Sequence, residues 1–170
     1  IAVITVLTAF MSGLAIGGFA AGRVADRVSR PLLAYAVLEG AIGLYALIFP
    51  WLVDGVVPIY TTLWSMFQLS PTAFAAIQFL LLGIFLLPPT ICMGATLPIL
   101  TRFATQTMED SGAQVGRLYG ANTIGAVLGV AIAGFYLLPN IGLQATTWHT
   151  ASANLLLCVV AGAMGLSIKG

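Results

Sequence analysis

Glu39 is the residue whose type and position could do chemistry in this chain. It lies eight positions into an uninterrupted apolar stretch, so in a helix it would sit about 12 Å from the nearer end of that stretch. Tyr35, Glu39 and Gly43 recur every four positions and therefore share one helical face. An ionised carboxylate inside a bilayer costs roughly 2.5–3.5 kcal/mol on insertion scales, so it needs a partner or a proton. Two roles stay open: a binding site for a cation or proton, and a structural glutamate that is protonated or hydrogen-bonded.

Asn122 and Thr123 are polar residues in another apolar stretch, at a depth close to that of Glu39. They lie about one helical turn from Arg117. A hydrogen bond between Glu39 and Asn122 is one expectation. The alternative is a purely structural role, because Asn and Thr commonly hydrogen-bond across transmembrane helices.

No metal-binding or nucleophilic constellation is evident in the sequence. His149, the single histidine, could ligate a haem or chlorophyll metal or sense pH, but one interfacial histidine also fits simple solvation. Cys92 and Cys158 lie in apolar segments without a CxxC pattern and are interpreted as packing thiols. His149 and Asp26 are predicted on opposite membrane sides, which excludes a Ser-His-Asp triad. We therefore expect no catalytic residue, no metal and no cofactor.

The composition indicates that these residues belong to a membrane protein. Hydrophobic residues make up 60% of the 170-residue chain and charged residues only 6%, whereas about a quarter of the residues in soluble domains are charged. The formal net charge of +1 gives no basis for binding nucleic acid.

Charged and turn residues divide the chain into five apolar stretches, each near or above the roughly 20 residues that a helix needs to cross the hydrocarbon core. The sequence therefore predicts an all-α integral membrane fold. Its five predicted transmembrane helices cover residues 1–22, 31–53, 71–102, 118–139 and 143–168. A short helix at about 58–69 is predicted to lie in the outer interface, and Ser70 followed by Pro71 is a typical helix start.

The cationic residues support this topology. When the five helices are traced through the membrane, all six lysine and arginine residues fall on one side: Arg23, Arg27, Arg30, Arg102, Arg117 and Lys169. The positive-inside rule makes that side cytoplasmic. Residues 23–30, residues 102–117 and the C-terminus are thus predicted in the cytoplasm, and the three tryptophans near the outer surface.

Two predicted helices carry small residues at every fourth position. The first stripe is Ala9, Gly13, Gly17 and Ala21, and the second is Ala121, Gly125, Gly129 and Ala133. Small residues allow close backbone approach in lipid, so we expect both helices to pack tightly against protein. Sliding of these helices in a transporter is the alternative interpretation.

The segment between the first two predicted helices resembles a loop motif of the major facilitator superfamily. Gly22, Asp26, Arg27 and Arg30 match its glycine, Asp-Arg pair and following basic residue. The resemblance implies that the aspartate braces helix ends and that the arginines face anionic headgroups. Ser29 replaces the usual glycine.

Three longer stretches are similar to the membrane domain of the bacterial fused transporter-like spermidine synthase family: FMSGLAIGGFAAGRVADR at 10–27, PPTICMGATLPILTR at 88–102, and GRLYGANTIGAVLGVAIAGFYLLPNIG at 116–142. The resemblance implies a six-helix half bundle with one further helix before residue 1, and often a soluble aminopropyltransferase-like domain after it. Neither is expected within these residues. No GxGxxG follows a predicted strand, so we expect no aminopropyltransferase activity and no enzyme in this chain.

These observations lead to three functional hypotheses. The first is a non-catalytic membrane module that binds or moves a cationic or amphiphilic small molecule, with polyamines implied by the resemblance and Glu39, Tyr35 and Asn122 as ligand-binding residues. The second is an accessory subunit of a larger energy-converting membrane complex, and the third is a plain anchor. Expected partners are lipids of the bacterial cytoplasmic membrane and other transmembrane helices packed on the glycine faces: the chain's own first helix, a second copy, or a larger complex.

Overall fold

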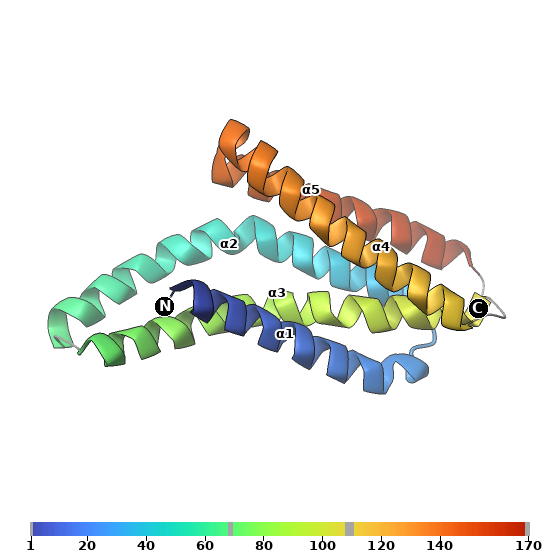
Figure 1. Ribbon diagram of the computed structural model, residues 1–170, viewed down its shortest axis with the longest axis horizontal. Helices are drawn as coiled ribbons and strands as arrows, with labels where there is room; N and C mark the ends of the chain where they lie inside the picture. The colour runs from blue at the N-terminus through green and yellow to red at the C-terminus, as the bar shows by residue number, and fades with distance from the viewer. Residues whose placement is uncertain (1, 68–69, 108–110, 169–170) are drawn as a thin grey trace.

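The computed structural model describes residues 2–67, 70–107 and 111–168, which form long helices joined by short connections and contain no strand. The elements are α1 (Ala2–Val24), the 3₁₀ turn η1 (Ala25–Arg27), α2 (Pro31–Phe67), α3 (Pro71–Thr107), α4 (Ser111–Ala131), the π-helical segment η2 (Ile132–Leu137) and α5 (Leu138–Ser167). The helices lie roughly along one long axis (Figure 1). Lys169, Glu109 and Asp110 lie outside the described residues.

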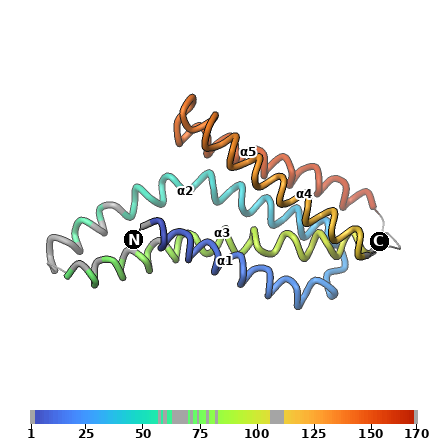
Figure 2. Tube along the Cα trace, in the orientation of Figure 1, coloured from blue at the N-terminus to red at the C-terminus, as the bar shows by residue number. Residues whose placement is uncertain are grey.

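Four of the helical segments are long and apolar enough to cross a membrane. They cover Val3–Arg27, Pro31–Val56, Ala75–Thr105 and Gly112–Ser167. The last segment is not straight, because Gly142 has φ 76° and ψ 175°, a conformation that only glycine adopts readily. At this point the chain turns back, so that α4 with η2 and α5 form a hairpin (Figure 2). Gly142 lies between the two helices that were predicted at 118–139 and 143–168.

The structure differs from the sequence prediction beyond residue 53. The separate interfacial helix expected at about 58–69 is instead a continuation of α2, which runs to Phe67 through Pro50 and Pro58; residues 68–69 lie outside the described part. A proline removes one backbone donor but does not prevent the helix from continuing on either side of it. The curved path of α2 in Figure 1 fits such interruptions.

Helix starts follow local sequence signals. Pro31 and Pro71 are each the first residue of a helix, a position where the missing backbone N–H is not needed. Ser70 accepts a hydrogen bond at its Oγ from the backbone N–H of Ala73, at 3.3 Å, which confirms the predicted N-cap.

Pro89 frees a carbonyl that a neighbouring helix then occupies. The carbonyl of Phe85 would accept a hydrogen bond from residue 89 in a regular α-helix, but proline has no N–H. The Tyr45 hydroxyl of α2 donates to this Phe85 oxygen at 2.7 Å. This side-chain bond connects α2 to α3 and satisfies a group that lipid could not satisfy.

Two helix pairs pack through glycine. In the pair α1 and α3, a Cβ added at Gly13 would overlap the Thr90 side chain, and one added at Gly17 would overlap the Ile91 carbonyl oxygen. A Cβ added at Gly94 of α3 would likewise overlap the backbone of Leu14. The two backbones therefore touch along this contact.

In the pair α2 and α5, the contacts run antiparallel. A Cβ added at Gly40 would lie 2.8 Å from the Cys158 sulfur, and one at Gly43 would lie 2.9 Å from Leu155. At the other end, Gly165 of α5 lies against Leu33 of α2.

The connections that carry arginine lie at one end of the molecule. The α1–α2 connection, the ends of α3 and α4 that face each other, and the last turn of α5 are all at the same end of the long axis (Figure 1). These segments contain Arg23, Arg27, Arg30, Arg102 and Arg117. We call this end of the molecule the cationic end.

The close contact at Gly17 yields a testable prediction. Gly17→Ala should lower the free energy of unfolding by about 1–3 kcal/mol, because the new methyl group overlaps the Ile91 backbone. Gly22→Ala on the same helix meets no atom within 4 Å and should be neutral or slightly stabilising, since alanine favours helix. Unfolding of both variants in mixed micelles, followed by circular dichroism, measures the difference. Equal stability of the two variants would contradict the packing described for α1 and α3.

Candidate functional site

Glu39 is buried on the side of α2 that faces the other helices of the bundle. Its exposed fraction is 8%. On one side of it along the helix surface, Tyr35 and Leu38 pack against a cluster of Ala21, Ala25 and Ile99 from α1, η1 and α3. On the other side, Gly40 lies against Cys158 of α5. The carboxyl group is therefore held in the region where α2 faces both α3 and α5.

Tyr35 is the polar side chain nearest to Glu39 along α2. The two residues are one helical turn apart on the same face, so the Tyr35 hydroxyl is placed where it can donate to the Glu39 carboxyl group. Gly43, one turn further along this face, leaves room for Leu155 and the Ala151 carbonyl of α5. The face that the sequence predicted thus points into the helix bundle, where an unpartnered carboxylate would be costly.

Asn122 is not brought to Glu39. Its side chain is exposed on α4 and forms no hydrogen bond to any described residue, whereas Glu39 is buried on α2. Thr123 donates to the Tyr119 carbonyl oxygen of its own helix at 2.9 Å. The expected hydrogen bond between Glu39 and Asn122 is therefore absent from the part of the chain that the structure describes.

The two glycine stripes have different surroundings. Gly13 and Gly17 lie against α3, as described above, but around Gly125 and Gly129 no atom lies within 4 Å of an added Cβ. Residues 121–130 are all exposed. Among the described residues, no helix packs on the face of α4 that carries Gly125 and Gly129.

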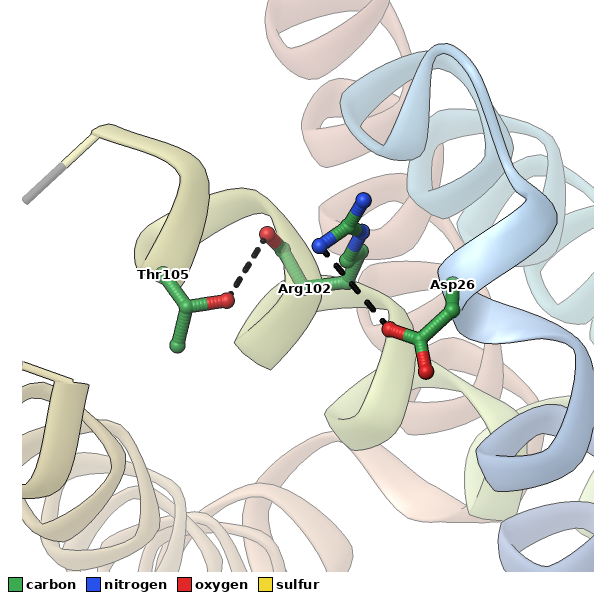
Figure 3. A network of polar contacts seen from close by, with 3 residues as sticks. All are labelled: Asp26, Arg102 and Thr105. Carbon is green, nitrogen blue, oxygen red and sulfur yellow. Dashed lines mark hydrogen bonds and ion pairs between the residues drawn. The ribbon is translucent and has the colours of Figure 1, made fainter.

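The loop motif forms an ion pair that sequence reasoning did not find. The Asp26 carboxylate lies 3.8 Å from a terminal guanidinium nitrogen of Arg102 on α3 (Figure 3). The Asp26 side chain is 88% exposed and the Arg102 side chain 32%, so the pair is worth about 0–1 kcal/mol. Both residues were predicted on the same membrane side, at the ends of different helices, but no spacing rule connects residues so far apart in sequence.

A shallow depression of about 320 Å³ lies beside this ion pair. Its lining residues come from α1, η1 and α3: Gly22, Ala25, Asp26, Leu97, Pro98, Thr101, Arg102 and Thr105. The Nε atom of Arg102 is buried and has no hydrogen-bond partner among the residues that the structure describes. The Thr105 hydroxyl donates to the Arg102 carbonyl oxygen at 3.2 Å, which fixes the local backbone of α3 (Figure 3).

The remaining loop arginines take different positions. The Arg23 guanidinium lies over the Phe19 ring, 3.4 Å from its centroid, an arrangement that stabilises a cation. Arg27 and Arg30 are exposed.

Metal-ligand geometry is not found among the described residues, where no three His, Cys, Asp or Glu side chains lie together. Cys92 and Cys158 are free thiols on α3 and α5. The Nδ1 atom of His149 lies 2.7 Å from the Ala145 carbonyl oxygen one turn earlier on α5.

Comparisons with protein-family models, with curated proteins and with solved structures gave no match.

The Glu39 site yields a second prediction. Glu39→Ala should lower the free energy of unfolding by about 1–3 kcal/mol, because it empties a buried position and leaves the half-buried Tyr35 hydroxyl without the neighbouring carboxyl group. Glu39→Gln retains hydrogen-bonding capacity and should have the smaller effect. Val37→Ala, at a position 70% exposed on the same helix, is the control. Denaturant titration followed by tryptophan fluorescence provides the measurement, and equal losses in Glu39→Ala and Val37→Ala would contradict the interaction.

Proposed function

We propose that this chain is a non-catalytic membrane module that supplies five of six transmembrane helices of a major-facilitator-like half bundle and receives the sixth on α4. The observation that carries this proposal is the repeated small-residue stripe, which is covered on α1 and uncovered on α4. The resemblance to the membrane domain of the spermidine-synthase-like family supports the same architecture.

The two stripes have the same residues in the same order. Ala, Gly, Gly and Ala recur at four-residue spacing in both, and Ala121 lies 112 positions after Ala9 (121 minus 9). One residue beyond each stripe is a further glycine, Gly22 in α1 and Gly134 in η2. The first stripe lies in α1, directly before α2, and the second lies in α4 and η2, directly before α5. The helices α2 and α5 are the packed pair described above.

Contacts between α2 and α5 support an internal relationship with the same offset. Gly43 of α2 lies against Leu155 of α5, and these residues are also 112 positions apart (155 minus 43). If a two-fold axis exchanges α2 with α5, each residue of α2 corresponds to the residue 112 positions later in α5. A residue that touches its own counterpart lies close to the axis, and Gly43 and Leu155 form such a pair. Inverted repeats of this kind build many transporter folds.

The proposed two-fold exchanges α1 with α4 and α2 with α5. Because α3 covers the stripe of α1, its symmetry-related counterpart would be a helix that covers the stripe of α4. No described helix takes that position. A lipid-exposed stripe of glycine offers weak packing, whereas a helix seated on it gains close van der Waals contact.

Association through α4 is tested by enlarging its small residues. Gly125→Leu combined with Gly129→Leu should remove a partner helix without disturbing the chain's own packing, since no described atom lies within 4 Å of a Cβ added at either glycine. Val127→Leu, on the opposite face of α4 and 64% exposed, is the matched control. Native electrophoresis after gentle detergent extraction should show the wild type and the control in a larger particle and the double variant outside it. A wild-type particle no larger than the chain alone, or an unchanged double variant, would contradict the proposal.

A second candidate function is the binding of a cationic small molecule at Glu39. The specific observation in its favour is that Glu39 is 8% exposed in an apolar helix bundle and that the described residues place only the Tyr35 hydroxyl one helical turn away from it. A polyamine would supply the positive charge, and the family resemblance suggests this class of ligand.

The cation hypothesis predicts that Glu39→Gln abolishes binding of a labelled polyamine to the purified protein. Removal of the negative charge is the physical cause, because the amide retains the size of the carboxyl group. Asp54→Asn, which removes an exposed acid from the same helix, should leave binding unchanged. Equilibrium dialysis gives the dissociation constants, and retained binding in Glu39→Gln would exclude this role.

A further inference from the structure

The backbone of α3 lacks two hydrogen-bond donors near its middle. Pro88 and Pro89 lie inside this helix, and we call residues 71–87 before them its outer part and residues 90–107 after them its inner part. Proline has no N–H, so the two carbonyl groups four residues earlier, of which that of Phe85 is one, have no donor in the helical pattern. Long helices bend at such interruptions, because fewer backbone hydrogen bonds hold the helix straight there.

The two parts of α3 are held unequally. In the inner part, a Cβ added at Gly94 would overlap the backbone of Leu14, and Ile99 is buried in a cluster with residues of α1 and η1. In the outer part, a Cβ added at Gly83 meets no described atom within 4 Å. The α2–α3 connection also extends along the long axis beyond the start of α1 and beyond the turn between α4 and α5 (Figure 1). Close backbone contact with α1 is thus found at the inner glycine and not at the outer one.

Tyr45 connects the outer part of α3 to α2. Its hydroxyl donates to the Phe85 carbonyl oxygen at 2.7 Å, and its ring centroid lies 6.2 Å from that of Phe49. Two residues before Tyr45 on α2, Gly43 is in close contact with Leu155 of α5. The outer part of α3 is therefore bonded to the pair α2 and α5, whereas the inner part is packed on α1.

Proline also interrupts α2 close to this bond. Pro50 follows Tyr45 by little more than one helical turn and removes the donor to the Ala46 carbonyl. Residues 51–67 of α2 and residues 71–87 of α3 run antiparallel toward their connection (Figure 1). We call these two segments the outer arm. Each of them is separated from the rest of its helix by proline.

We infer that the outer arm is hinged at its prolines and that the Tyr45 hydroxyl latches it to the rest of the bundle. The hinges are Pro50 in α2 and the two central prolines of α3. The latch spans them, because Tyr45 precedes the hinge of α2 and Phe85 lies in the arm. Release of this one bond lets the arm turn while the glycine contacts of α1 with α3 and of α2 with α5 stay closed. In lipid a released Phe85 carbonyl would lack a donor, so the latched arrangement is the stable one there.

Distances between spin labels test the latch on the full chain in nanodiscs, with double electron–electron resonance as the measurement. The reporting pair is Leu80→Cys in the outer arm and Val159→Cys in α5, at positions that are 61% and 67% exposed. The reference pair joins Val159→Cys to Ile16→Cys of α1, at a position 50% exposed. Both pairs are made in a chain whose native Cys92 and Cys158 are changed to alanine.

Tyr45→Phe should broaden the distance distribution of the reporting pair by about 4 Å, because Leu80 lies about 12 Å before Pro88 and a turn of about 20° moves it that far. The reference pair should keep its width. Adding Pro89→Ala to Tyr45→Phe should restore the narrow distribution, since the new backbone N–H can donate to the Phe85 carbonyl. The inference depends neither on a helix at α4 nor on a bound cation.

Phe49→Leu is the matched control, because it changes the ring beside Tyr45 and keeps the hydroxyl, so its distribution should stay as narrow as that of the wild type. An unchanged reporting pair in Tyr45→Phe would overturn the inference. So would equal broadening of both pairs, or a distribution that stays broad after Pro89→Ala is added. Pro89→Ala alone restores a backbone donor and should give a distribution at least as narrow as the wild type; a broader one would also overturn the hinge.

Discussion

Direct contact between helix backbones is the constraint on which the rest of this structure depends. Gly13 and Gly17 allow α1 to touch α3, and Gly40 and Gly43 allow α2 to touch α5. Lipid chains are as apolar as leucine, so burial of leucine does not hold helices together in a bilayer, and close van der Waals packing must do so. The second contact also fixes the surroundings of Glu39, because its neighbour Gly40 lies against Cys158 of α5.

Close packing also determines how backbone polar groups are satisfied. Prolines at positions 88 and 89 interrupt the hydrogen bonds of α3, and the Tyr45 hydroxyl reaches the freed Phe85 carbonyl because α2 lies beside α3. Thr90, which is 3% exposed, donates within its own helix to Leu86 at 2.7 Å. The Phe85 carbonyl thus obtains its partner from a neighbouring helix, and the Thr90 hydroxyl obtains one within its own helix.

Most helices and the cationic end could be predicted from the sequence, because hydropathy, proline and arginine placement are local signals. The ends of α2 and α3 could not. Both helices continue beyond their predicted apolar segments: α2 runs past Pro58 to Phe67, and α3 runs past Arg102 to Thr107. Extending a helix that has already formed costs less than starting a new one, so a proline or a charged residue did not end either helix.

Contacts between distant residues were the other limit of prediction. The ion pair between Asp26 and Arg102 depends on how the ends of α1 and α3 meet, which no sequence spacing encodes. Depth alone suggested that Glu39 and Asn122 would meet, but equal depth does not specify which helix faces are neighbours. The stripes at Gly13 and Gly125 look alike in sequence, yet in the part of the chain that the structure describes a helix packs only on the first.

The position of Glu39 restricts the ways in which a transport role could operate. Its neighbour Gly40 and the next small residue of that face, Gly43, are both in close contact with α5. A sliding motion between α2 and α5 would force Cys158 and Leu155 past these glycines, and packed interfaces resist continuous deformation. Any cycle of cation binding and release would therefore move α2 and α5 together, as one rigid pair against another body. The uncovered face of α4, on which the proposed sixth helix would pack, is where such a body would meet this chain.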